Sequence, residues 1–194
     1  MKKSFILMAV FILLGSNLYA GNLTVNGDIT ANNIWMKVTE VDLTNSPGHT
    51  VTGLDGDKQK MYKVIFNGTI SSSPGNSRML LLRANGDNTN YRGFYKYNGS
   101  IGGDDSIYIG MFLGQAFWTS SAGTFTIEYT MGAETGKLRC GSASPSIFMT
   151  ETYNLVDTGT NVSCWKNTTD NITSLRIEPT NGTISGRLMV FALQ

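Results

Sequence analysis

Three short runs rich in β-branched, aromatic and leucine residues, separated by turn-forming residues, constrain the fold of this chain most strongly. They occupy Lys60–Ser100, which reads KMYKVIFNGTI-SSSPGNS-RMLLLRA-NGDNTN-YRGFYKYNGS. In the first run Tyr62, Val64 and Phe66 recur with a period of two. This period, bounded by Gly, Asn, Asp, Ser and Pro, is typical of β-strands, and three such runs in succession predict an antiparallel meander. Because a meander cannot bury its apolar face alone, we expect the rest of the chain to supply a second sheet.

Further strand candidates lie on both sides of this meander. They are Ile34–Leu43, residues 107–113 and 125–131, Leu138–Cys140, Ile147–Met149, Val162–Trp165, Ile172–Ile177 and Leu188–Leu193. No stretch keeps an apolar period of 3.6 residues for long enough to predict a helix. About ten strands at short spacing, with turns between them, predict an all-β protein built as an antiparallel β-sandwich or barrel.

The first twenty residues, Met1–Ala20, have the layout of a secretory signal peptide. Two lysines precede the apolar run Phe5–Leu14, and a cleavage point follows at Ala20. The run is shorter than the roughly 20 residues that a bilayer-spanning helix needs. We therefore expect export to the cell exterior, the cell surface or the periplasm, the alternative being an uncleaved N-terminal anchor. No second long apolar segment follows, so we expect no stable membrane insertion after cleavage.

The segment 21–33, GNLTVNGDITANN, is expected to be an extended N-terminal strand or arm. Leu23, Val25 and Ile29 all lie at odd positions, so one face of the segment is apolar. It is either an edge strand or hairpin of the same domain, or a free arm that pairs with a neighbouring subunit. The expected organisation is thus a signal peptide (1–20), this segment (21–33) and one β-sandwich domain (34–194).

The charge and the cysteine content indicate which classes of binding partner and which redox compartment to expect. The chain has 15 basic and 14 acidic side chains, and no Lys/Arg cluster marks a nucleic-acid surface. Its two cysteines, Cys140 and Cys164, both lie in expected strands. In an oxidising compartment we expect them to form a disulfide, the alternative being two buried thiols that never meet.

The residues that catalysis or metal binding would need are sparse. His49, the single histidine, lies in a Pro-Gly turn, and no nucleophile motif accompanies it. One histidine and two separated cysteines do not make a tetrahedral zinc set. Asp55–Asp57 and Asp87–Asn90 offer oxygen ligands for a surface Ca²⁺, but neither has the spacing of an EF-hand loop. We therefore expect no enzyme activity, no metal and no cofactor.

Aromatic residues offer a different kind of site, since sugars stack on exposed rings. Trp118, in a loop-like segment beside Ser and Thr, and Tyr91 are the candidate ligand-binding residues. The alternative is that such rings fill the core or cover a sheet, as strand aromatics usually do.

Three segments together resemble a known family. They are MLLLRANGDNTNYRGFYKYNGS (Met79–Ser100), SIYIGMFL (Ser106–Leu113) and ITSLRIEPTNGTISGRLMVFAL (Ile172–Leu193). These segments are similar to the jelly-roll-like β-sandwich modules of tailed-phage virion proteins, found in tail fibres, head fibres and minor structural proteins. The resemblance implies a jelly-roll-like sandwich used for assembly or for binding to a surface.

Together these features predict an exported, non-enzymatic structural subunit of an extracellular or virion-like fibre or filament. Its partner would be a further copy of itself, joined through Leu23, Val25 and Ile29 of the N-terminal segment. The alternative is a secreted β-sandwich module that binds a surface carbohydrate or a receptor through Trp118 and Tyr91.

Overall fold

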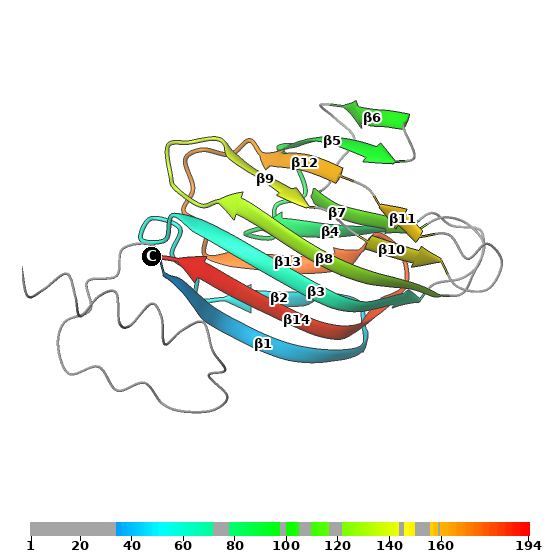
Figure 1. Cartoon of the computed structure of the whole chain (residues 1–194). Helices are drawn as coiled ribbons and strands as arrows, with labels where there is room; N and C mark the ends of the chain where they lie inside the picture. Colours follow the sequence, from blue (N-terminus) through cyan, green and yellow to red (C-terminus); the bar gives the residue numbers. More distant parts are fainter. Residues whose placement is uncertain are drawn as a thin grey trace, which may run out of the picture. The chain divides into compact units, whose positions relative to one another are not determined.

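The computed structural model describes residues 34–71, 78–97, 100–104, 110–116, 122–143, 146–149, 156–158 and 160–194. Within these residues it contains fourteen β-strands in two antiparallel sheets (Figure 1). The strands are β1 (Trp35–Ser46), β2 (His49–Thr52), β3 (Met61–Ser71), β4 (Arg78–Ala84), β5 (Tyr91–Tyr97), β6 (Ser100–Asp104), β7 (Met111–Ala116), β8 (Ala122–Gly132), β9 (Arg139–Ala143), β10 (Ser146–Met149), β11 (Val156–Thr158), β12 (Thr160–Trp165), β13 (Ser174–Pro179) and β14 (Thr183–Leu193).

Eight of these strands form a jelly roll. One sheet contains the order β1-β14-β3-β8 and the other has the order β2-β13-β4-β7, so successive strands of this set alternate between the sheets. The only break in that alternation is the pair β4–β7, which are neighbours in the second sheet. Two four-stranded antiparallel layers connected in this way are the jelly-roll arrangement. The prediction of an antiparallel, jelly-roll-like β-sandwich is confirmed.

The other six strands come from two long connections. The one between β4 and β7 carries β5 and β6, and the one between β8 and β13 carries β9, β10, β11 and β12. Four of them continue the larger sheet in the order β8-β9-β12-β5-β6, whereas β10 pairs with β8 and with β11. Figure 1 shows this extension beyond the jelly-roll core. These insertions explain why the described residues hold more than the expected ten or so strands.

The core lies between the sheets and follows the two-residue period expected from the sequence. In β3 the side chains of Tyr62, Val64 and Phe66 are buried, and in the neighbouring β14 those of Leu188 and Val190 are buried opposite them. Burial of an alternating apolar face against a second sheet is what stabilises a sandwich.

Two glycines allow β3 and β14 to approach closely at their midpoint. Gly68 and Gly186 are direct partners in the pairing, and Gly186 has a φ of +140°. A Cβ atom at Gly186 would lie 2.2 Å from the carbonyl oxygen of Asn67. The sheet therefore requires glycine at this position.

Residues 1–33 lie outside the described part of the chain, as do the predictions made for the signal peptide and for Leu23, Val25 and Ile29. Across the residues that the structure does describe, no helix is long and apolar enough to cross a membrane.

Candidate functional site

The predicted disulfide is present. Cys140 of β9 and Cys164 of β12 are direct partners in the strand pairing and are joined by an S–S bond, with a sequence separation of 24. The bond ties together two strands of the sheet extension. A disulfide between half-buried cysteines on adjacent strands indicates that the protein is found in an oxidising environment.

Tyr91 does not offer a ring to a ligand, which corrects the expectation from the sequence. Its side chain is 2% exposed. The hydroxyl accepts a hydrogen bond from the amide of Ala84 at 3.0 Å and donates one to the carbonyl of Asp87 at 3.2 Å. The first position of β5 directs this side chain into the core, where burial raises the pKa of the phenol. The other candidate, Trp118, lies outside the described residues.

Trp165 and Asp87 hold the loops at one end of the sandwich together. The indole Nε1 of Trp165 donates to Oδ2 of Asp87 at 2.8 Å, and the amide and hydroxyl of Thr89 donate to Oδ1. Burial would raise the pKa of Asp87, but these hydrogen bonds outweigh it and the pKa lies below its ordinary value. The carboxylate thus has a structural role, and Trp165 is buried.

The described residues contain no group of three side chains that could hold a metal ion. In the loop Asp87–Asn90, the aspartate oxygens are occupied by protein donors. His49 is the first residue of β2 and pairs there with Ile177.

The outer edge of β1 is one candidate for an interaction surface. β1 is the last strand of the larger sheet, so no strand lies beyond it among the described residues. Three large apolar side chains at its beginning are exposed: Ile34 by 48%, Met36 by 49% and Val38 by 39%. An open strand edge with exposed apolar side chains is a template for pairing with another chain.

The register explains why these side chains are uncovered. Met36 is paired with Ala192, a buried residue, and so lies on the core side of the sheet. However, β2 has only four residues and cannot run beneath all twelve of β1. Val38 falls at a register shift between Lys37 and Thr39, where the pairing with β14 is irregular. The first half of β1 therefore overhangs the sandwich.

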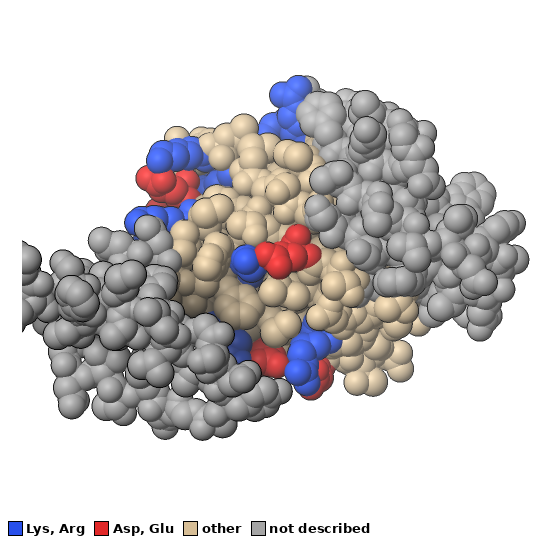
Figure 2. Space-filling view, viewed as in Figure 1, with Lys and Arg blue, Asp and Glu red and all other residues tan. Residues whose placement is uncertain are grey.

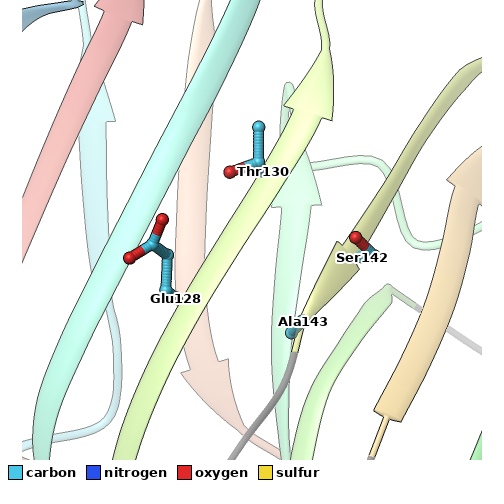
Figure 3. Close-up of a pocket in the computed structure, with 4 residues that line it drawn as sticks. All are labelled: Glu128, Thr130, Ser142 and Ala143. Atoms are coloured by element: carbon cyan, nitrogen blue, oxygen red, sulfur yellow. The ribbon is translucent and has the colours of Figure 1, made fainter.

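A second candidate surface is a groove on the outer face of the larger sheet. It consists of two adjoining depressions that share Thr130 of β8 and Ser142 of β9. We call it the β8–β9 groove, and its lining residues are Met61, Glu128, Thr130, Cys140, Gly141, Ser142, Ala143 and Val162. Figure 3 shows one half of it, with Glu128 and Thr130 on β8, Ser142 and Ala143 at the end of β9, and the Glu128 side chain extending toward β3.

Two local features mark the ends of this surface. Strand β9 stops pairing with β8 at Ala143, so Glu128 has no neighbour from β9 beside it. At the other end Gly132 ends β8, and a Cβ atom added there would meet nothing within 4 Å. The missing side chain at Gly132 leaves space above the sheet at that end.

Charges at the groove are paired. Glu128 binds Lys63 of β3 with an N–O distance of 2.7 Å, and the Lys63 ammonium lies 5.1 Å from the ring centre of Trp35. Figure 2, which views this face, shows a basic and an acidic group side by side near its centre, within a largely uncharged surface.

No known protein family matches the chain, and no curated protein matches it at a significant level of similarity.

Proposed function

We propose that this chain is an exported, non-enzymatic structural subunit that joins an extracellular or virion-like assembly through strand β1 and the segment 21–33. The observation that carries the proposal is the open edge of β1, with Ile34, Met36 and Val38 exposed. The disulfide supports export, because such bonds persist in oxidising compartments. The jelly roll supports the resemblance to virion modules at the level of the fold.

The segment 21–33 fits the edge in length and in pattern. Fully extended, it spans roughly 40 Å, nearly the same as the twelve residues of β1. Its apolar residues at odd positions, Leu23, Val25 and Ile29, supply the side chains that would cover the exposed apolar row of β1. In the proposed assembly, the segment of one subunit pairs with β1 of the next.

Molecular mass and shape test this proposal directly. We would compare residues 21–194 with residues 34–194 by multi-angle light scattering and negative-stain imaging. The longer chain is expected to form a fixed oligomer or a filament, and the shorter chain to remain a monomer. A longer chain that stays monomeric at high concentration would mean that the segment folds back on its own β1, and it would overturn the proposal.

Point variants locate the contact. In residues 21–194, Met36→Lys and Val38→Lys place charges on the edge and should abolish assembly while leaving the thermal midpoint of unfolding almost unchanged, since both side chains are exposed. The matched control is Leu138→Lys, which changes a side chain that is 55% exposed and lies away from β1. Equal assembly by all three variants would rule out β1 as the contact.

A further inference from the structure

The polar groups of the β8–β9 groove are free to bind a ligand. Thr130 and Ser142 are direct partners in the β8–β9 pairing, so their side chains lie on the same, outer face of the sheet. Across the described residues, no hydrogen bond ties either hydroxyl to the protein. Each hydroxyl can donate one hydrogen bond and accept others, and the exposed carboxylate of Glu128 accepts.

The walls of the groove are apolar. Met61 borders it on the β3 side, and Val162, which is 48% exposed, borders it on the β12 side. The half-buried disulfide forms part of the same wall through Cys140. Apolar walls with a few converging polar groups are the usual composition of a small-molecule or saccharide site.

The surroundings exclude two other classes of ligand. Lys63 neutralises Glu128, so the groove attracts neither polyanions nor cations by charge. Both strands beneath the groove are already paired on their two sides at Thr130 and Ser142, so no edge is open there for an added peptide strand. The remaining chemistry is that of an uncharged ligand rich in hydroxyl groups and with apolar C–H faces.

We propose that the β8–β9 groove binds a short, uncharged oligosaccharide. The oligosaccharide lies along β8 from Glu128 to Gly132, a length of about 13 Å. Its hydroxyls bond with Glu128, Thr130 and Ser142, and its C–H faces contact Met61 and Val162. This site is separate from the assembly edge, because it lies on β8 and β9 and not on β1.

The key variant is Gly132→Val, which adds a side chain next to Met61, the lining residue with which Gly132 is paired, and so narrows this end of the groove. A Cβ atom has open space at this position, and a β-branched residue suits a strand, so the fold should be retained. Thr126→Val is the matched control, because it places the same side chain on the outer face of β8 at a residue that does not line the groove.

The probes are hexasaccharides of α-1,4-glucose, β-1,4-glucose, β-1,4-mannose and β-1,4-N-acetylglucosamine, titrated calorimetrically into the full secreted protein. At least one should bind, with the affinity reduced about tenfold or more by Gly132→Val and left unchanged by Thr126→Val. The double variant Glu128→Gln/Ser142→Ala should weaken the binding of the same hexasaccharide. It provides a second test of the groove if Gly132→Val does not fold.

Three results would overturn the proposal. One is the absence of binding by all four probes at about 10 mM. Another is equal binding by wild type and by the folded groove variants. The third is binding in the groove of an acidic polysaccharide or a peptide in place of the neutral sugars. None of these outcomes bears on assembly through β1, which light scattering measures independently.

Discussion

At the scale of the residue, Leu138 and Arg139 have the opposite burial to that usual for their side chains: the apolar one is exposed and the charged one is buried. Leu138 is 55% exposed, whereas Arg139 is fully buried. The guanidinium lies 5.0 Å from the ring of Trp165. Burial lowers the pKa of Arg139 below its ordinary value, and the nearby carboxylates of Asp57 and Asp170 only partly offset this effect. The guanidinium nevertheless stays charged, as arginine does in proteins. The charge is tolerated because its N–H groups find oxygen acceptors on Ala133, Asn167, Asp170 and Thr135.

Removing this guanidinium should therefore be costly. Arg139→Met keeps the aliphatic stem but leaves three backbone carbonyls without their donor, and we expect a loss of about 3 kcal/mol in the free energy of unfolding. Denaturant-induced unfolding of the variant and the wild type measures this change in the free energy of unfolding. Leu138→Ser is the control, expected to change the free energy by no more than about 0.5 kcal/mol. A loss below about 1 kcal/mol for Arg139→Met would show that water replaces the lost donors.

At the scale of the element, the pairing of β3 with β14 organises the molecule. It runs without interruption from Met61 opposite Leu193 to Ser71 opposite Thr183. The close approach of the strands at Gly68 and Gly186 lets the pairing continue through its centre. Since β14 also pairs with β1, a disturbance at this point would reach the proposed assembly edge.

Gly186→Ala should disrupt this pairing. Its φ of +140° is strained for any residue with a side chain, and the added Cβ would meet the Asn67 oxygen at 2.2 Å. We expect a loss of more than about 2 kcal/mol in the free energy of unfolding. In contrast, Gly132→Ala in β8 adds the same methyl group to open space and should be nearly neutral. Similar thermal midpoints for the two variants would contradict this account.

At the scale of the whole molecule, the jelly roll and its sheet extension are connected in different ways. In the larger sheet, β3 pairs with β14 and with β8 over eleven residue pairs each, whereas β9 and β12 pair over five and carry the disulfide. The extension also shares the core, because Tyr129 of β8 hydrogen-bonds to Ser163 of β12 through its hydroxyl. The disulfide thus reinforces a part of the sheet that has fewer backbone hydrogen bonds.

The double variant Cys140→Ser/Cys164→Ser tests this difference. The loop of 24 residues predicts a loss of about 3 kcal/mol in the free energy of unfolding. Amide hydrogen exchange should become faster in β9, β12 and β5, while exchange in β3 and β14 changes less. A uniform increase in all strands would mean that the extension and the jelly roll open as one unit.

The sequence by itself determined most of the strands, though not β2, β6 and β11, together with the sandwich class and the disulfide pair. The two-residue period is local, so the alternation of Tyr62, Val64 and Phe66 predicted a strand with one buried face, and that strand is β3. The chain contains two cysteines, so only one intramolecular pairing was available, and compartment chemistry favoured it.

The tertiary structure decided what depends on partners distant in the chain. Strand order joins β1 to β14, and no local pattern encodes that pairing. Alternation gives each strand two faces but does not say which one meets the core, so Tyr91 was expected at the surface and is buried. For the same reason, the overhang of β1 and the β8–β9 groove could not be predicted: which residues of two strands lie beside each other is a property of the packed sheets.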